Sequence, residues 1–103
     1  MARKRGRTPS TTRRIERLVF ADGSFLEGTI TQFAPTPQRQ AGVDYRLAYV
    51  AADGTVLVLY DNQAGHPQHR HVKGRREPYE FVDADRLVSD FLADVAGVRS
   101  GEQ

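Results

Sequence analysis

Two Asp-Gly pairs, Asp22-Gly23 and Asp53-Gly54, constrain the fold of this sequence more than any other feature. Each pair lies between two short runs rich in β-branched and aromatic residues. These runs span 15–20 and 25–33 around the first pair, and 45–50 and 56–60 around the second. Asp-Gly is typical of the tight turns that join antiparallel strands, because such turns require a positive φ that Gly accepts. The sequence therefore predicts two β-hairpins that together supply four strands.

The fourth run, 56–60, is apolar on both faces, which predicts a central strand covered on both sides. The C-terminal segment offers an amphipathic helix as a cover. Asp83 suits the N-cap of this helix, and Gly97 suits its left-handed C-terminal cap. Apolar residues recur between them at helical spacing and form one stripe: Leu87, Val88, Phe91, Leu92, Val95 and Ala96. Asp90 and Asp94, one helical turn apart, are expected on the solvated side.

A short fifth strand is predicted at 69–73, between the second hairpin and the helix, and a sixth is permitted at 79–82. Segment 34–42 contains two prolines and a terminal glycine, which is typical of a loop. The predicted fold class is therefore α+β, an antiparallel β-meander of about five strands packed against one C-terminal helix.

The length of 103 residues favours one domain. Residues 1–13 lack apolar periodicity and are rich in Arg, Thr, Ser, Gly and Pro, so they are predicted to form a flexible basic arm. The single α+β domain is expected to span 14–97. Residues 98–103 are polar and are expected to fray.

The composition excludes several classes of protein. There is no cysteine, so disulfides and thiolate zinc sites are excluded. No apolar stretch is long enough to cross a membrane, and the charged N-terminus lacks the apolar region of a signal peptide. We therefore expect a cytoplasmic protein with no membrane partner. An exposed edge strand would permit a homodimer, although nothing in the sequence specifies one.

The net charge of +2 hides a marked asymmetry. Residues 1–14 carry six basic side chains and no acid, whereas the segment from Glu77 onward carries seven acids and two arginines. A second basic cluster consists of Arg70, Lys73, Arg75 and Arg76. Such clusters are typical of surfaces that bind a polyanion.

Alternation along the predicted fifth strand places His69, His71 and Lys73 on one face and Arg70 on the other. Two imidazoles and an ammonium are not typical of a protein core. Asp61 ends the preceding strand, and its connection to His69 is short enough to bring the carboxylate near this face. These residues therefore form the candidate site.

One interpretation of this face is acid–base cleavage of RNA. The reaction needs one group that takes the 2′-hydroxyl proton and another that protonates the departing 5′-oxygen, and imidazole titrates in the required range unaided. His69 and His71 would be the acid and the base, with Asp61 orienting a histidine, in a metal-independent ribonuclease without a cofactor. The expected phosphate contacts are Arg70, Lys73, Arg75 and Arg76. Tyr45, Tyr60 and Tyr79 are candidates for stacking an unpaired base, although the alternation of Tyr45 with Arg46 favours packing in the sheet.

Two other interpretations stay open. His66, His69, His71 and Asp61 offer three nitrogens and one oxygen that zinc or another divalent ion would accept, although the neighbouring basic side chains disfavour a dication. Alternatively, the histidines are surface residues of a charged edge strand. The protein would then be a non-catalytic binding module for nucleic acid or for an acidic partner protein.

A hairpin that leads to Tyr60-Asp61-Asn62 is followed by the cluster His69-Arg70-His71 and then by an acidic helix. This order of motifs, over residues 15–96, resembles the TumE-like toxins of prokaryotic toxin–antitoxin pairs. The resemblance implies a small growth-inhibiting toxin, neutralised by direct contact with a cognate antitoxin that carries a helix-turn-helix domain. RNA is the implied target by analogy with other toxins of this size. The stretch between the two motifs is shorter than the family leads us to expect, so the resemblance supports His66 less than the other histidines.

Overall fold

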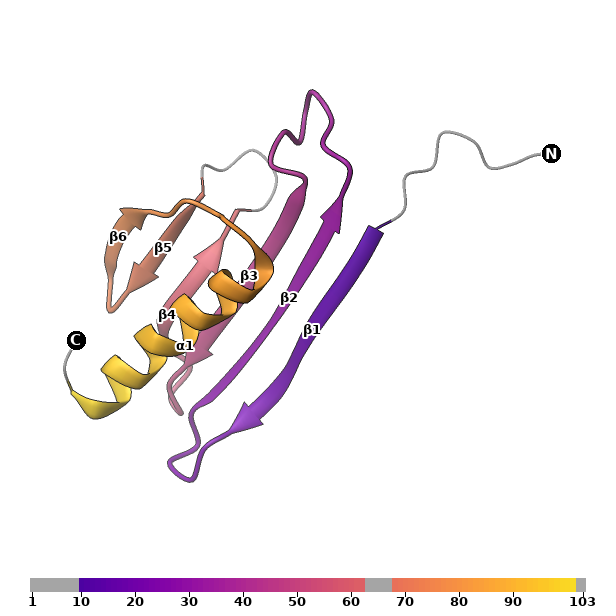
Figure 1. The fold of residues 1–103 in the computed structure, drawn as a ribbon. Coiled ribbons are helices and arrows are strands. Elements are labelled where there is room, and N and C mark those ends of the chain that lie inside the picture. The colour runs from indigo at the N-terminus through magenta and orange to yellow at the C-terminus, as the bar shows by residue number, and fades with distance from the viewer. Residues whose placement is uncertain (1–9, 63–67, 102–103) are drawn as a thin grey trace.

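The computed structural model describes residues 10–62 and 68–101. Within them, six antiparallel strands follow one another across a single sheet in chain order, and a C-terminal helix packs against that sheet (Figure 1). The elements are β1 (Ser10–Val19), β2 (Phe25–Phe33), β3 (Val43–Val50), β4 (Val56–Asp61), β5 (His69–Val72), β6 (Arg75–Pro78) and α1 (Ala84–Ser100). The predicted α+β class, with its meander and C-terminal helix, is confirmed.

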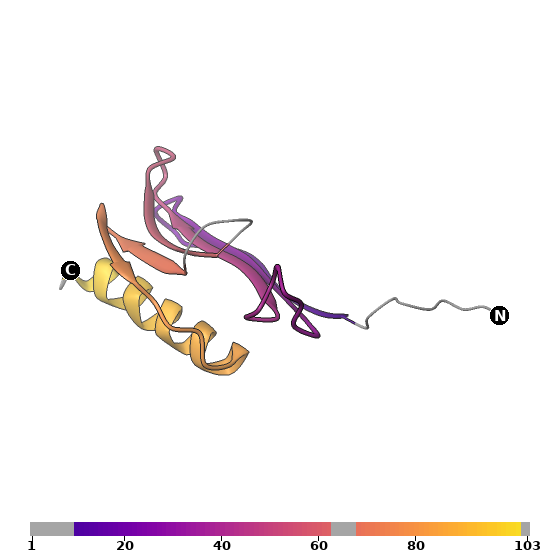
Figure 2. The same cartoon turned by 90° about the horizontal axis from the view of Figure 1, so that it is seen from above.

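The helix covers only one face of the sheet. Seen from above, α1 forms a second layer on one side of the strands, and no described helix or strand lies on the other side (Figure 2). We call these two sides the helix side and the open face. Val58 and Tyr60 of β4 are 0% exposed on the helix side, whereas Leu57 and Leu59 on the open face are partly exposed. The prediction that this strand is covered on both sides is therefore wrong.

The first strand begins earlier than predicted. β1 starts at Ser10 rather than near Ile15, because β2 is long enough to pair with it as far as Ser10 opposite Phe33. Residues 10–13 therefore belong to the sheet and not to the predicted arm.

The sixth strand lies at Arg75–Pro78 and not at 79–82. Lys73 and Gly74 have φ angles of 49° and 83°, so they form a two-residue turn that starts the return strand at once. The fifth strand accordingly ends at Val72, one residue earlier than predicted.

The helix is longer than predicted. Asp83 is its N-cap as expected, and the carboxylate accepts a hydrogen bond of 2.7 Å from the backbone N–H of Arg86. Gly97 lies inside the helix, however, and the left-handed cap is Gly101, with a φ of 83°. Residues 98–100 are thus helical and not frayed. Among the described residues, no helix combines the length and the apolar character needed to cross a membrane.

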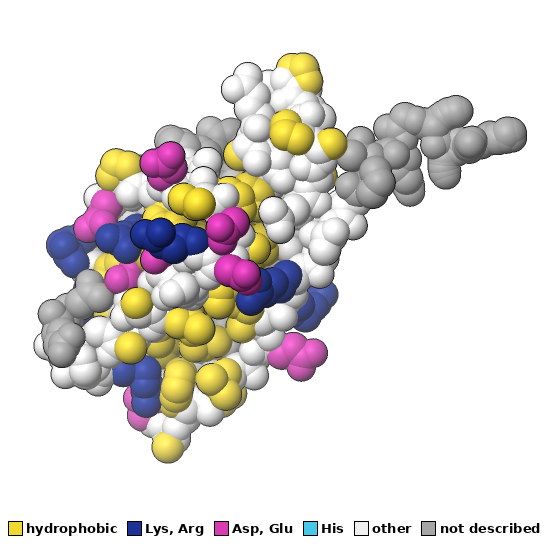
Figure 3. All heavy atoms as spheres, viewed as in Figure 1, with side chains coloured by type: hydrophobic (Ala, Val, Ile, Leu, Met, Phe, Trp, Pro, Cys, Tyr) yellow, Lys and Arg dark blue, Asp and Glu magenta, His cyan; other side chains and the backbone are white. Residues whose placement is uncertain are grey.

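The core lies between α1 and the helix side of the sheet. It consists of alternate residues of four strands and one stripe of the helix: Leu26, Ile30, Val43, Tyr45, Leu47, Tyr49, Val58, Tyr60, Val72, Leu87, Phe91 and Val95. The rings of Tyr60 and Phe91 meet edge to face, with centroids 5.8 Å apart. Apolar side chains gather beside the helix on this side of the molecule, and the two described histidines do not come into view there (Figure 3).

A polar cluster ties the helix to the sheet within this core. Asp94 of α1 accepts hydrogen bonds from the Tyr60 hydroxyl and from Arg70 Nη1, the latter at 3.0 Å. Burial and the Asp94 carboxylate raise the pKa of Tyr60, so its hydroxyl keeps the proton that it donates. Arg70 also binds Glu77 of β6, with 2.7 Å between Nη2 and Oε1. Asp94 is only 8% exposed, so the expectation that it lies on the solvated side is wrong.

The close approach of β2 and β3 requires a glycine at position 28. A Cβ there would lie 2.9 Å from Leu47 Cγ and 3.0 Å from the Arg46 carbonyl oxygen, and Leu47 is fully buried. We expect Gly28→Ala to lower the free energy of unfolding by about 1–3 kcal/mol in urea titrations, because the packed core must shift. Gln32→Ala, at an exposed position of the same strand, should cost less than about 0.5 kcal/mol. An unchanged urea midpoint for Gly28→Ala would contradict this close approach.

Candidate functional site

The register of β4 and β5 places both described histidines on the open face. His69 lies opposite Asp61, and His71 lies opposite Leu59, whereas Arg70 lies opposite the buried Tyr60. The predicted alternation along β5 is therefore confirmed for these three residues, and the Asp61 carboxylate shares a face with the two imidazoles, as expected.

The two histidines lie next to each other. Their ring centroids are 4.9 Å apart, and the ring planes are tilted by 48°. His71 Nε2 is buried, and it neither donates nor accepts a hydrogen bond among the described residues. Burial, and after it the neighbouring His69 and Arg76, lower the pKa of His71 below its usual 6.5, against a smaller opposing effect of Asp61. The lowered pKa favours the neutral imidazole, the form that can accept a proton.

The three side chains of the segment Tyr60-Asp61-Asn62 lie in three different environments. Tyr60 points into the core cluster on the helix side, and Asp61 points to the open face. Asn62 is 8% exposed and binds β3 through both ends of its amide. Its Oδ1 accepts from the Tyr45 backbone N–H and its Nδ2 donates to the Val43 carbonyl, each at 2.8 Å. The Asn62 amide thus fixes the strand end from which Asp61 projects.

Arg76 is the basic residue of the predicted cluster that joins the histidines on the open face. It lies opposite His71 in the pairing of β5 with β6 and is exposed. Next to it, a hollow of about 290 Å³ is lined by Gln68, His69, Arg76, Glu77 and Pro78. His69 and Arg76 therefore border one small surface depression.

The structure does not bring the other predicted phosphate contacts to this face. Arg70 points to the helix side, where Asp94 and Glu77 bind it, because it lies between strand neighbours that face the open side. Arg75 pairs opposite the buried Val72 and lies 3.7 Å from Glu77, also on the helix side.

Lys73 lies in the β5–β6 turn with a left-handed backbone, so strand alternation does not place its side chain with the histidines. The predicted stacking residues Tyr45 and Tyr60 are 1% and 0% exposed, which removes them from any base-binding surface. Tyr79 is partly exposed, and its hydroxyl donates to Asp90 on the helix side.

Two arginines of the open face were missed by reasoning from the sequence. Arg46 lies opposite Asp61, and Arg14 lies opposite Thr29, which is the cross-strand neighbour of Arg46. Alternation in the sequence indicates that Arg46 points away from the core residues Tyr45 and Leu47. The register of the strands is needed to align it with the histidines.

The alternative metal site involves His66, which lies outside the described residues. Within residues 10–62 and 68–101, no group of three His, Asp or Glu side chains is arranged to hold a metal ion. The described partners of that set, His69, His71 and Asp61, share the open face.

Comparison with known proteins adds one match. A family model described as "Toxin TumE" matches residues 3–99, which is nearly the whole chain. No curated protein and no solved structure matches the chain. The match extends over every described strand and almost all of α1.

Proposed function

Since this chain belongs to the TumE toxin family, and hence to the toxins of toxin–antitoxin systems, we propose that it inhibits growth by cleaving RNA at the histidines of its open face. One observation carries this proposal. His69, His71, Asp61 and Arg76 come from three neighbouring strands and share one face that no described element covers. An RNA strand needs such an open surface, because a chain of this size has no deep cleft to enclose it.

His71 is the proposed base. Its lowered pKa favours the neutral imidazole, and the proton of a 2′-hydroxyl would go to Nδ1, because Nε2 is buried. The 2′-oxygen then attacks the adjacent phosphorus, and the bond from phosphorus to the 5′-oxygen breaks. The products are a 2′,3′-cyclic phosphate and a 5′-hydroxyl.

His69 is the proposed acid, which gives its proton to the departing 5′-oxygen. Asp61 lies opposite His69 and has the charge and position to orient a protonated imidazole. Arg76 would stabilise the negative charge that develops on the phosphoryl oxygens, because a guanidinium donates two parallel hydrogen bonds to such a group. Arg70, held by Asp94 and Glu77, has no part in this scheme.

The partner in this proposal is a cognate antitoxin with a helix-turn-helix domain, which binds the toxin directly. The proposed site of action is the cytoplasm, where cellular RNA is available.

The test is incubation of the purified protein with total cellular RNA, with and without a chelator. We expect cleavage in both conditions, with 2′,3′-cyclic phosphate ends detected by their resistance to a ligase that needs a 3′-hydroxyl. Cleavage that the chelator abolishes would favour a metal site that includes His66. Absence of cleavage in both conditions would contradict the proposed ribonuclease activity and favour binding without catalysis.

A non-catalytic binding module is the second candidate, favoured by the exposed and basic Arg76 on the open face. In this case RNA binding would weaken steeply with salt, since bound cations are released from the RNA, and no product would form.

A further inference from the structure

The arginines of the chain divide into two groups by their ion pairs. Seven of the described arginines bind a carboxylate: Arg13, Arg17, Arg39, Arg70, Arg75, Arg86 and Arg99. Arg14, Arg46 and Arg76 form no ion pair within the part of the chain that the structure describes. The second group is thus the one whose charge is available to a ligand.

All three unpaired arginines lie on the open face. Arg14 pairs with Thr29 across β1 and β2, and Thr29 pairs with Arg46 across β2 and β3. Arg46 is exposed on the side opposite to its buried neighbours Tyr45 and Leu47. Arg76 reaches the same face through its pairing with His71. Among the described arginines, the charge without a carboxylate partner is therefore concentrated on the side that carries the histidines.

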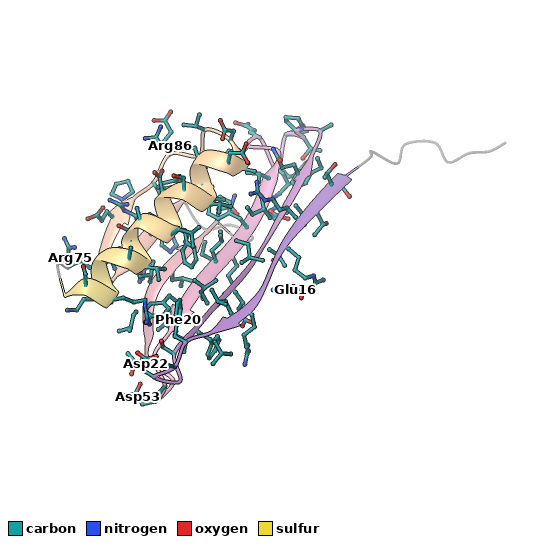
Figure 4. All side chains as sticks on the ribbon, turned by 60° about the horizontal axis from the view of Figure 1, so that its bottom comes forward. Glu16, Phe20, Asp22, Asp53, Arg75 and Arg86 are labelled. Atoms are coloured by element: carbon teal, nitrogen blue, oxygen red, sulfur yellow. The ribbon has the colours of Figure 1, made fainter. Side chains whose placement is uncertain are left out.

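A surface hollow of about 400 Å³ lies between Arg14 and Arg46. Thr29 lies between them in the strand pairing and also lines the hollow. The other charges at the hollow are Arg17 and Glu27, which bind each other, and Glu16, which lies on the outer side of β1 (Figure 4). The two unpaired guanidinium groups thus give the hollow a net positive charge.

The spacing of these arginines fits a polymer better than a single small anion. Neighbouring strands are roughly 4.8 Å apart, so Arg14 and Arg46, two strands apart, are separated by about 10 Å at the backbone. Arg46 is in turn about 10 Å from His69 along the same cross-strand row. Arg14 and His69 are thus about 20 Å apart at the backbone, a span that one phosphate cannot bridge but that successive phosphates of one strand can occupy.

We propose that Arg14 and Arg46, with the Thr29 hydroxyl between them, form a second phosphate-binding subsite that holds single-stranded RNA several nucleotides from the histidines. This inference rests on the proposed function, because it names where the substrate runs beyond the reacting bond. Guanidinium groups bind phosphate oxygens in a bidentate way, so the subsite positions the strand without reading its sequence.

Asp61 lies between Arg46 and His69 in this row and repels phosphate. The strand therefore contacts the face on either side of Asp61, at the arginine subsite and at the histidines with Arg76. This arrangement predicts that substrates longer than a dinucleotide bind more tightly, because only they reach both places.

The test is binding of a fluorescent 2′-O-methyl oligonucleotide of about ten nucleotides, which lacks the attacking hydroxyl, measured by anisotropy. We expect Arg14→Gln/Arg46→Gln to weaken binding at least tenfold. The slope of log affinity against log salt should fall by about 1.4, that is 0.7 for each of two lost phosphate contacts. Arg13→Gln/Arg86→Gln is the matched control, because it removes two charges whose carboxylate partners lie on the helix; it should change the affinity less than twofold.

Cleavage assays provide the second arm. The subsite variant should lose kcat/KM on the long RNA while it cleaves a dinucleotide like the unmodified protein. An unchanged affinity of Arg14→Gln/Arg46→Gln, or an equal loss in the control variant, would overturn the subsite. If RNA is not cleaved but the affinities change as expected, the proposed ribonuclease activity is wrong and the proposed phosphate-binding subsite is supported. Far-UV circular dichroism checks folding, and the single replacements serve where the double variant unfolds.

Discussion

His71→Ala is expected to slow RNA cleavage by at least 100-fold, and His69→Ala/His71→Ala to abolish growth inhibition. A positioned general base or acid contributes roughly 10²–10⁴-fold to the rate, and the double variant removes both. Rates are measured on a labelled oligonucleotide with purified protein, and toxicity by growth after induced expression. His66→Ala is the matched control, because the proposal gives that histidine no role, and it should keep nearly full activity.

The pH dependence of cleavage separates a base from a merely structural histidine. The base must be neutral, so the rate should rise with pH as His71 loses its proton. Since burial, His69 and Arg76 lower the pKa of His71, the midpoint of this rise should lie below 6.5. NMR titration of the His71 ring should give the same midpoint.

If the His69→Ala/His71→Ala variant remained fully toxic, the two histidines would have no role in the mechanism.

The strands of the hairpins follow from local sequence, and so they were predictable. Asp-Gly turns and alternating apolar residues act over a few positions, which is why β2, β3 and β4 agree with the expectation within a few residues. The histidine face follows from the same alternation in β5. Lys73 does not follow this alternation, because the turn Lys73-Gly74 ends the strand. Gly74 is the sequence signal that would have indicated the turn.

The arginine subsite required information that no single strand contains. Arg14, Arg46 and His69 belong to three strands, and a shift of any one register by one residue would move its side chain to the other face. The pairing of Arg70 with Glu77 was hidden for the same reason, because it depends on the register of β5 and β6. Asp94, in contrast, follows Phe91 by three residues and Leu87 by seven, which places it on the buried stripe of the helix, so its burial was open to prediction.

Asp94→Ala is expected to lower the free energy of unfolding by about 3 kcal/mol. The change removes the acceptor of the Tyr60 hydroxyl, which is 0% exposed, and one of the two carboxylates that bind Arg70. A buried donor without its acceptor costs about 1–3 kcal/mol, and a partly buried charge that loses a partner adds to this. Arg70 keeps Glu77 and some exposure to water, which limits the second contribution. Urea titration followed by far-UV circular dichroism measures the change.

Asp85→Ala provides the matched control on the same helix. Asp85 also binds an arginine, Arg13, but its side chain is 91% exposed, so its loss should cost less than about 1 kcal/mol. Asp94→Asn should fall between the two, because it keeps an acceptor but loses the charge. If Asp94→Ala cost no more than Asp85→Ala, the cluster would not hold the helix to β4, β5 and β6. The histidine face, which β5 carries, would then depend on the sheet alone.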